Sequence, residues 1–247
     1  MAYKKTHFGF QQIDECDKNE QVAKVFHQVS AKYDLMNDVM SGGLHRLWKR
    51  FTVTIAMIRP EDRILDMASG TGDLAIHLSK KLSKKGELWC ADINCSMLHI
   101  GRNRLLNKGL IVPLVNADAE AVPFQNNYFD CIVIAFGLRN MTRQDQALKE
   151  MYRVLKPKGR LIILEFSKVH RSFFKLYQFY TLKALPLLGK WIANDQASYR
   201  YLGESISVHP DQNMIKEMMI QAGFCQVSYF NLSAGIVALH KGFKRCD

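Results

Sequence analysis

The sequence predicts an α/β fold, a doubly wound and mostly parallel sheet of seven strands that ends in an antiparallel C-terminal hairpin. Between residues 63 and 166, short apolar runs alternate with stretches of helical periodicity, as parallel strands alternate with their crossover helices. Near the end of the chain, a short turn joins two β-rich runs at residues 226–232 and 235–241, which indicates an antiparallel pair. The length of 247 residues fits one domain of moderate size.

The individual elements are expected in the following order. Val22, Val25 and Phe26 belong to an apolar stripe that predicts an amphipathic helix over residues 20–33. A continuous apolar run at residues 129–136 is typical of a strand covered on both faces. The other expected elements are strand 63–67, helix 73–82, strand 87–92, a helix from Ser96, strand 111–115, a helix started by a Thr142–Asp145 capping box, and strand 160–166.

We expect a single domain over residues 1–247 with two helical additions. Residues 1–55 precede the first strand of the alternation and are expected to form an N-terminal helical lid. Residues 167–210 do not fit the alternation and are expected to form an inserted helical cap.

Composition narrows the classes of function. No stretch approaches about 18 uncharged apolar residues and no signal-peptide core is present, so a cytoplasmic location is expected. Six cysteines are scattered without C-x-x-C spacing, so neither a disulfide framework nor a metal site is indicated. The net charge of +11 fits a solvated basic surface first and an anionic membrane surface second. No RNA-binding signature is present, so no nucleic-acid partner is expected.

A glycine loop follows the first expected strand and opens a helix. Gly70 and Gly72 remove side chains that would keep a ligand away from the backbone, and the helix presents free N–H groups at its start. The run from Gly70 to Ala75 satisfies the dinucleotide pattern G-x-G-x-x-A, but Asp66 and Asp73 bracket the loop. Adjacent carboxylates oppose a pyrophosphate and suit a cationic ligand, so S-adenosylmethionine is the expected cofactor.

A second acid supports this interpretation. Asp92 ends the next strand about 20 residues beyond the loop, where a carboxylate can accept hydrogen bonds from both ribose hydroxyls. A further acidic loop at Asp118–Glu120 comes later in the chain. The alternative is that these acids are only turn and cap residues. Together they favour a class I S-adenosylmethionine-dependent methyltransferase with a Rossmann-like sheet.

Several segments resemble the ubiquinone/menaquinone C-methyltransferase family, and the resemblance covers nearly the whole chain. The first signature of the family is matched by Tyr33–Ser41 with His45 and Trp48, and the second by Arg153–Arg160 running on to Glu165–Ser167. Further similar segments are Thr6–Phe10, Phe136–Asn140, Tyr199–Leu202 and Gly235–His240. The chain departs from the family at Ser69, where members usually carry a second loop glycine, and at Lys158, which replaces a glycine of the second signature.

The resemblance implies methyl transfer from S-adenosylmethionine to a ring carbon of a prenylated quinol, either a naphthoquinol such as demethylmenaquinol or a benzoquinol of ubiquinone synthesis. It carries cofactor contacts to Thr71, Asp92, Asp118 and Ala119. Asp66 and Gly70 join them on the argument from the loop itself. No metal is needed for this reaction.

Catalytic candidates follow from position and from the resemblance. Arg139 and Asn140 come at the end of a strand and are expected to orient the quinol oxygens, although a salt bridge to a nearby acid is an equal alternative for Arg139. His45 is a candidate base in the lid segment, and a capped or surface residue is the alternative. The cap contributes Tyr201 as a fourth candidate, with Tyr199, Arg200 and His209 as similar ones.

The segment from Ser172 to Asn194 alternates apolar and aromatic residues with lysines. This pattern suits peripheral association with the inner face of an anionic cytoplasmic membrane, and the alternative is a helix packed on the sheet. Pro186 is expected to break any single long helix there. The open sheet edge near the C-terminal hairpin permits a homodimer. Two other functions are considered, an NAD(P)-linked oxidoreductase that uses the same loop and a nucleic-acid-binding or nucleic-acid-methylating protein suggested by the charge.

Overall fold

The structure is a computed structural model that describes residues 5–30, 33–193 and 195–245. Its main sheet has seven strands in the order β5-β4-β3-β6-β7-β9-β8, and only the pairs that involve β9 are antiparallel. The predicted fold class is therefore confirmed. The strands are β3 (Arg63–Met67), β4 (Glu87–Asp92), β5 (Leu114–Asn116), β6 (Phe129–Ala135), β7 (Leu155–Phe166), β8 (Cys225–Leu232) and β9 (Val237–Phe243).

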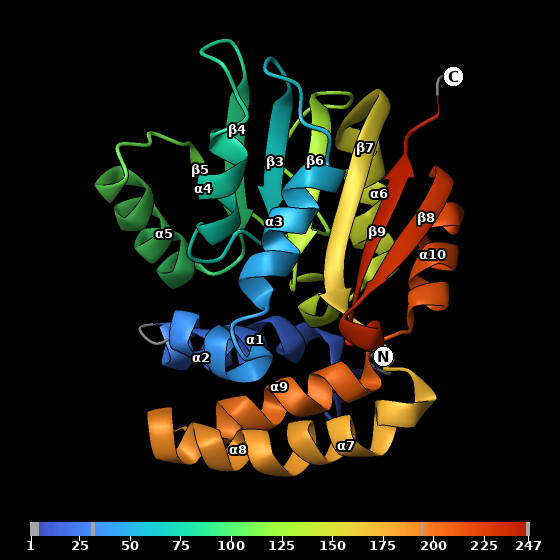
Figure 1. The fold of residues 1–247 in the computed structure, drawn as a ribbon. Helices are drawn as coiled ribbons and strands as arrows, with labels where there is room; N and C mark the ends of the chain where they lie inside the picture. Colours follow the sequence, from blue (N-terminus) through green and yellow to red (C-terminus); the bar gives the residue numbers. More distant parts are fainter. Residues whose placement is uncertain (1–4, 31–32, 194, 246–247) are drawn as a thin grey trace.

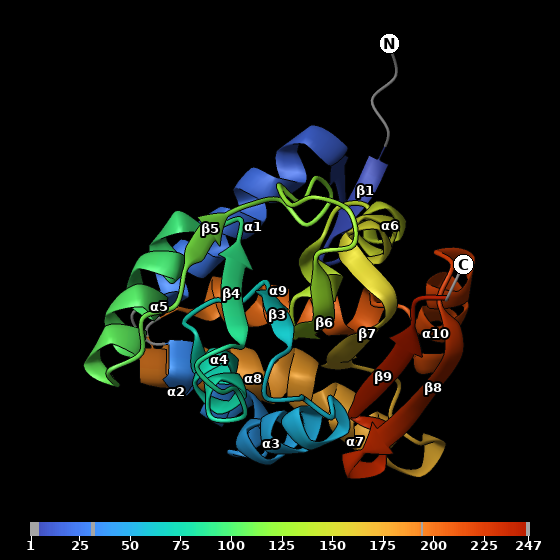
Figure 2. The same cartoon turned by 90° about the horizontal axis from the view of Figure 1, so that it is seen from above.

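Helices cover both faces of the sheet, with α3 and α4 on one side and α6 and α10 on the other (Figures 1 and 2). The central strands β3 and β6 and the second half of β7 are largely apolar because both of their faces are buried. The helices of this α/β unit are α3 (His45–Ile55), α4 (Asp73–Ser79), α5 (Cys95–Asn107), α6 (Gln144–Val154) and α10 (Gln212–Gln221), with the short turn η2 (Leu138–Asn140) after β6.

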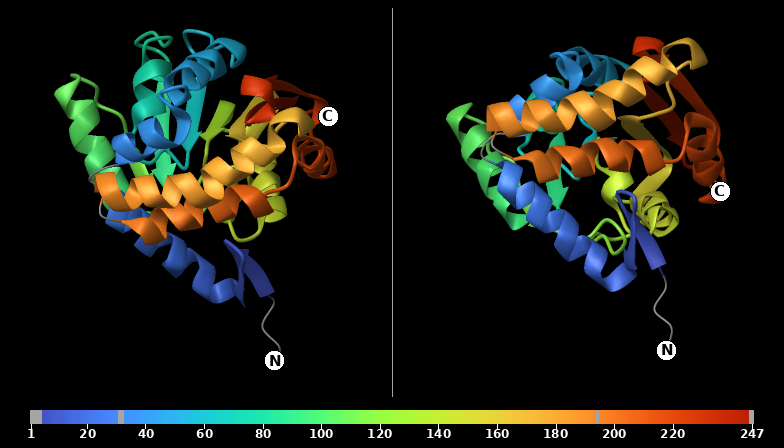
Figure 3. Two further views of the ribbon diagram at one scale, coloured as in Figure 1. Left: turned by 60° about the horizontal axis from the view of Figure 1, so that its bottom comes forward. Right: turned by 90° about the horizontal axis from the view of Figure 1, so that it is seen from below.

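A further layer of helices lies across the carboxyl edge of the parallel strands. In Figure 1 the arrowheads of β3, β6 and β7 point toward it, and Figure 3 shows its rows from below. The layer contains α1 (Glu15–Val29), α2 (Tyr33–Ser41), η3 (Arg171–Phe173), α7 (Phe174–Phe179), η4 (Tyr180–Ala184), α8 (Leu185–Leu188), η5 (Gly189–Ala193) and α9 (Gln196–Val208). Open α/β sheets bind ligands beyond this edge, so the layer lies over the place where a site is expected.

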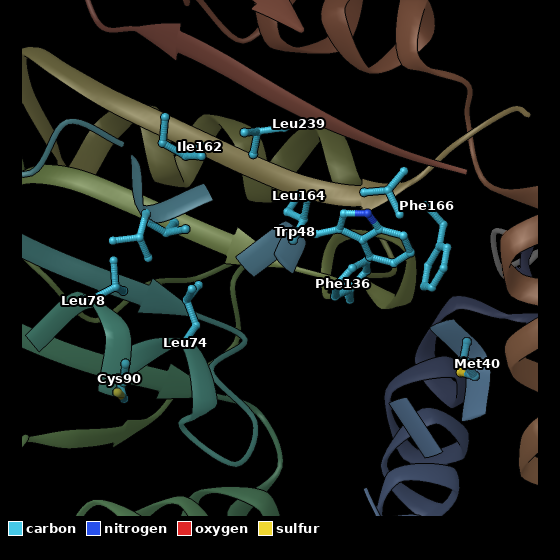
Figure 4. Close-up of a cluster of buried hydrophobic side chains, with 14 of the residues drawn as sticks. Met40, Trp48, Leu74, Leu78, Cys90, Phe136, Ile162, Leu164, Phe166 and Leu239 are labelled. Carbon is cyan, nitrogen blue, oxygen red and sulfur yellow. The ribbon is translucent and has the colours of Figure 1, made fainter. Parts of the chain in front are cut away.

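The core on the α3–α4 side reaches this edge through aromatic side chains. Phe136 lies against Trp48 and Phe166, with ring centroids 6.2 Å and 4.9 Å away (Figure 4). Leu74 and Leu78 of α4 continue the same apolar cluster under the sheet. The loop after β6 is therefore anchored in the core at the position where it leaves the sheet.

Several predicted boundaries are wrong. The first helix runs over Glu15–Val29 rather than 20–33, because acids in its first turn favour an earlier start. Residues 31–32 lie outside the described residues, and Tyr33 begins α2. Helix α4 ends at Ser79 rather than 82, and β5 begins at Leu114 rather than 111. Strand β7 begins at Leu155 rather than 160, because Leu155 already pairs with Phe129.

Two predicted helix starts are also wrong. The side chain of Asn94, not Ser96, caps α5 by accepting bonds from the backbone N–H groups of Ser96 and Met97. Thr142 caps nothing, because its hydroxyl bonds to Asn19 instead, and α6 begins at Gln144 with no side-chain cap. The first error arises because the polar run before α5 contains more than one residue able to cap, whereas α6 begins without any capping side chain.

The chain also continues helically through Pro186, where a break was expected. The segments from η3 to η5 follow one another without interruption, and the π-helical turns η4 and η5 flank α8. A π-helical turn widens the helix locally, and Pro186 lies in the first turn of α8, where proline is tolerated. The sequence also gave no sign of a small hairpin formed by β1 (Lys5–Phe8) and β2 (Gln11–Asp14). The C-terminal antiparallel pair β8–β9 is confirmed.

Candidate active site

A cavity of ≈ 760 Å³, including its open mouth, lies at the carboxyl ends of β3, β4 and β6. This volume is within the range of small-molecule sites. Its walls come from α1, from the glycine loop after β3, from the ends of β4 and β5, and from the loop after β6. Of the predicted cofactor residues, Gly70, Asp92, Asp118 and Ala119 line it.

Asp92 holds the glycine loop in place. Its carboxylate accepts the Gly70 backbone N–H at 2.8 Å and the Asn94 N–H at 2.9 Å, one on each oxygen. Burial raises the pKa of Asp92, and these backbone donors oppose that rise. Because each carboxylate oxygen can accept a second bond, the side chain retains capacity toward the cavity. Two ribose hydroxyls fit this arrangement.

Asp66 lies beneath the same loop. It is 1% exposed, and its Oδ2 atom has no hydrogen-bond partner among the described residues. Burial raises the pKa of Asp66 to about 8, the ammonium of Lys49 lowers it, and Asp92 and Asp73 raise it further. Lys49 itself is buried and pairs with Asp73 at 2.7 Å. Asp66, Asp73 and Lys49 thus form a buried cluster of two acids and one cation beneath the site. The carboxylates that line the cavity itself are those of Asp92, Asp118 and Glu120, and they suit a cationic ligand better than an anionic one.

The second acidic loop closes the cavity beside α1. Asp118 uses Oδ1 to accept the Glu120 N–H at 2.9 Å and Oδ2 to accept the Asn19 amide at 3.4 Å. Ala119 presents a small, buried side chain to the cavity. The loop thus places a carboxylate and backbone groups beside the apolar side chains of α1 that line the same cavity.

Helix α1 forms a wall that the sequence did not predict. Asn19, Val22, Ala23 and Phe26 line the cavity. Side-chain bonds tie this helix to both sides of the site, with Lys18 donating to the Met141 carbonyl at 3.0 Å and Asn94 donating to the Ala23 carbonyl at 3.2 Å. Its apolar stripe at helical spacing was the only available signal, and that stripe is equally typical of a helix packed in the core.

The loop after β6 forms the opposite wall. Phe136 has a left-handed backbone with φ 60°, and so does Ala68 of the glycine loop with φ 55°. The two loops touch, because a Cβ atom at Gly137 would lie 2.5 Å from the Cβ of Ala68. Glycine is therefore required at position 137 for this approach.

Asn140 and Tyr201 are brought together. The Tyr201 hydroxyl donates to Asn140 Oδ1 at 3.1 Å, and Phe8 stacks on the Tyr201 ring with centroids 4.3 Å apart. Asn140 lines the cavity, while Tyr201 lies behind it and is buried. Burial raises the pKa of Tyr201, so its hydroxyl stays a donor at neutral pH. This bond directs the Asn140 amide nitrogen away from Tyr201. The nitrogen donates one hydrogen to the Phe136 carbonyl at 3.5 Å, which leaves its second hydrogen available as a donor.

Arg139 forms the ion pair that the sequence left as an alternative. Its Nη1 atom donates to Glu165 Oε1 at 2.8 Å and to the Phe136 carbonyl at 2.6 Å. The side chain is 4% exposed and does not line the cavity. Direct contact between Arg139 and a substrate therefore stays a prediction.

The remaining candidates lie away from the cavity lining. His45 bonds to Asp38 at 2.9 Å, and burial lowers its pKa. Thr71 accepts a bond from Arg104 at 3.0 Å. His209 and Tyr199 are buried without a side-chain partner among the described residues, and Arg200 is exposed. The Tyr33 side chain lies outside the described part of the structure. The described residues contain no group of three or more metal-ligating side chains.

Comparison with known proteins assigns the chain to a family. The model of the ubiE/COQ5 methyltransferase family matches residues 14–244. The chain belongs to the ubiE/COQ5 methyltransferase family. The ubiquinone/menaquinone biosynthesis C-methyltransferase UbiE of Laribacter hongkongensis (strain HLHK9) is 58% identical over 241 residues, which cover 98% of this chain and 99% of the relative. The UbiE protein of Neisseria meningitidis serogroup B (strain ATCC BAA-335 / MC58) is 57% identical over 244 residues, covering 99% and 100%.

Solved structures share the fold at low identity. A SAM-dependent methyltransferase from Thermotoga maritima, described as a possible histamine N-methyltransferase, has a TM-score of 0.64 at 20% identity and covers 91% of this chain and 100% of its own. The [4+2]-cyclase SpnF has a TM-score of 0.67 at 16% identity, covering 93% and 97%. Since a cyclase shares this fold, the fold alone does not fix the reaction.

Membership of the ubiE/COQ5 methyltransferase family does fix the reaction class. The predicted S-adenosylmethionine-dependent methyltransferase and its methyl donor are confirmed. Nothing favours the oxidoreductase or the nucleic-acid protein considered from the sequence. The acid-lined cavity agrees with this result, because its walls offer carboxylates where a pyrophosphate would need donors.

Proposed function

We propose that this enzyme methylates a ring carbon of a prenylated quinol in menaquinone or ubiquinone synthesis, converting demethylmenaquinol to menaquinol or acting on the corresponding benzoquinol. The observation that carries the proposal is the identity of 57–58% with UbiE proteins over almost the full length of both chains. The cavity supports it, since an amide donor at Asn140 lies opposite the carboxylates that suit the methyl donor.

The donor side of the cavity is built to bind and orient a cationic nucleoside. When bound, S-adenosylmethionine supplies an electrophilic methyl group on its sulfonium. We assign Asp92 to the ribose hydroxyls, Asp118 and Ala119 to the adenine, and Gly70 and Thr71 to the loop that approaches the amino-acid part. Asp66 lies buried beneath that loop, where its raised pKa of about 8 keeps the carboxyl protonated at neutral pH.

The acceptor side must make a ring carbon nucleophilic. A phenol carbon reacts once its hydroxyl loses a proton, because the phenolate places electron density on the ring. Asn140 is assigned to the quinol oxygen as a hydrogen-bond donor, held in that orientation by Tyr201. Arg139 lies behind the loop with its charge balanced by Glu165 and holds the loop that carries Asn140, and His45 is the candidate base of the lid.

Methyl transfer to demethylmenaquinol in detergent tests the proposal, with the product identified by mass spectrometry. Wild-type protein should form the methylated quinol, and Asn140→Ala should lower kcat while retaining affinity for S-adenosylhomocysteine. Tight binding of S-adenosylhomocysteine without methylation of either the naphthoquinol or the benzoquinol would refute it. Which quinol reacts faster decides the ring class.

We also propose that the segment from α7 to η5 associates peripherally with an anionic cytoplasmic membrane. Phe179, Leu187 and Trp191 are exposed at 62%, 54% and 86%. They recur every four residues together with the exposed Lys175 and Lys183, so apolar and cationic side chains share one helix face. None of the described helices is both long and apolar enough to cross a bilayer. Residue 194, at the end of the segment, lies outside the described residues.

Liposome flotation tests the membrane proposal. Wild-type protein should float with vesicles that contain anionic lipid, and Phe179→Ser with Trp191→Ser should abolish flotation. Ile111→Ser is the matched control, because Ile111 is 91% exposed but lies outside the segment. Absence of flotation with anionic vesicles, or equal loss in the control, would overturn it.

The expected domain roles are proposed on the same footing. Residues 1–55 act as the lid and residues 167–210 as the cap of one methyltransferase domain, since α1 lines the cavity and Tyr180 of the cap donates to the Val39 carbonyl of α2 at 2.5 Å. The edge strand β8 offers a surface for a homodimer. Sedimentation at several concentrations tests the dimer, and a constant monomer mass would exclude it.

A further inference from the structure

Glu165 has an unusual set of bonds for a buried acid near the end of a strand. Its side chain is 1% exposed. Oε1 accepts Arg139 Nη1 at 2.8 Å and the Phe166 N–H at 2.9 Å, and Oε2 accepts the Arg139 backbone N–H at 3.2 Å. The carboxylate therefore holds Arg139 by both its side chain and its main chain.

The bonds from Glu165 to Arg139 continue to the wall of the cavity. Arg139 donates a second bond to the Phe136 carbonyl at 2.6 Å, and its guanidinium lies 5.1 Å from the Phe166 ring centre. Phe136, Gly137 and Asn140 belong to the same loop and line the cavity, whereas Glu165 and Arg139 lie behind it. A displacement of Glu165 must consequently move the loop that carries Asn140.

We infer that Glu165 is a positioning residue of the methyl-transfer site, which fixes the loop 136–141 through Arg139 and so sets the place of Asn140 against the acceptor. The inference rests on the proposed quinol methylation. Reacting atoms must approach to about 3–3.5 Å, and a shift of about 1 Å in a positioning group can cost on the order of 100-fold in rate. Glu165 does not touch the substrate and transfers no proton.

A second buried pair on the same strand separates positioning from mere stability. Arg160 donates to Asp62 at 2.5 Å, and the two residues are 7% and 5% exposed. This pair lies at the opposite end of the parallel strands, where Arg160 also donates to the Met57 carbonyl at 3.1 Å. Removing either carboxylate leaves a buried arginine without its counter-ion, so comparable losses of stability are expected.

The experiment compares Glu165→Gln with Asp62→Asn at temperatures where both variants are folded. In Glu165→Gln, kcat for quinol methylation should fall by roughly 10- to 100-fold while the Kd of S-adenosylhomocysteine changes by less than about twofold. Hydrogen exchange of the backbone amides of residues 136–141 should accelerate in this variant. Asp62→Asn should lose thermal stability but keep the wild-type kcat and the wild-type exchange of that loop.

Equal kcat values and equal loop exchange in the two variants would overturn the inference. If Glu165→Gln does not fold, Glu165→Asp replaces it, because this variant keeps the charge but withdraws the carboxylate by one methylene. A wild-type rate and wild-type loop exchange in Glu165→Asp would likewise overturn it. If the wild-type enzyme methylates no quinol, the proposed function fails, and loop exchange still decides the role of Glu165.

Discussion

The hydroxyl of Tyr201 donates to Asn140 Oδ1 at 3.1 Å, which joins helix α9 to the turn after β6. The bond couples the cap, which the sequence placed apart from the α/β unit, to a residue that lines the cavity. Together with the bond from the amide nitrogen to the Phe136 carbonyl, it fixes the orientation of the Asn140 amide.

Tyr201→Phe should therefore lower kcat without weakening the binding of S-adenosylhomocysteine. Loss of one hydrogen bond is worth about 1 kcal/mol, so a drop of roughly fivefold is expected. Tyr199→Phe is the matched control, because Tyr199 lies in the same helix and its hydroxyl has no partner among the described residues. Steady-state kinetics of both variants check this, and equal rates in the two would refute it.

Asp92→Asn should weaken the binding of S-adenosylhomocysteine by about 10- to 100-fold. An amide cannot accept both the Gly70 and Asn94 N–H groups, and it also loses the charge-assisted bonds. Asp130→Asn is the control, since Asp130 also accepts a backbone N–H, that of Arg63 at 2.9 Å, at the other end of the strands. Isothermal titration calorimetry should show a loss of affinity in Asp92→Asn alone.

Asp66 should make stability fall as pH rises. Its pKa is raised to about 8 in the folded protein from 3.8, so the folded state retains a proton that the unfolded state has lost. Stability from this group is complete below the lower value and is lost progressively up to the higher one. Between pH 7 and 8 the free energy of unfolding should drop by about 1 kcal/mol.

Asp66→Asn should remove that drop, which urea unfolding at the two pH values can measure. The comparison with the variant cancels the contribution of the buried histidines, whose lowered pKa values leave them neutral in the folded state while about a quarter of each is protonated at pH 7 in the unfolded state. A variant with the same pH slope as the wild-type protein would show that Asp66 does not hold the proton.

Lys158→Gly should stabilise the protein. Lys158 is exposed and has φ 65°, a left-handed backbone that costs a lysine more than a glycine. After allowance for the greater entropy of glycine in the unfolded chain, a gain of about 0.5–1 kcal/mol is expected. Lys183→Gly, at an exposed helical position, should instead lower the free energy of unfolding by about 1 kcal/mol. Thermal unfolding distinguishes the two signs.

The sequence predicted the sheet and the edge at which its acids gather, for a local reason. Strands buried on both faces are largely apolar, and Asp66, Asp92 and Asp118 lie at or just beyond the carboxyl ends of strands that meet at one edge. Local pattern is enough to place such residues on the same side of the sheet.

The acceptor side depends on contacts that no local pattern contains. Arg139 and Glu165 are 26 residues apart and meet only because β6 and β7 pair. The sequence therefore suggested an ion pair for Arg139 but did not identify Glu165 as the partner. The stripe that includes Val22 indicates an apolar helix face but does not say whether that face meets the core or a cavity. Tyr201 reaches Asn140 across 61 residues for the same reason.

The contact between Gly137 and Ala68 bears on the distance over which the methyl group is transferred. Strands β3 and β6 are neighbours in the sheet, about 4.8 Å apart, and each turns directly into one of the two touching loops. In the proposed reaction, one loop belongs to the side that binds the methyl donor, and the other presents Asn140 to the acceptor. The span that the methyl group must cross is then set by the spacing of two adjacent strands, and not by the helical layer that covers the site.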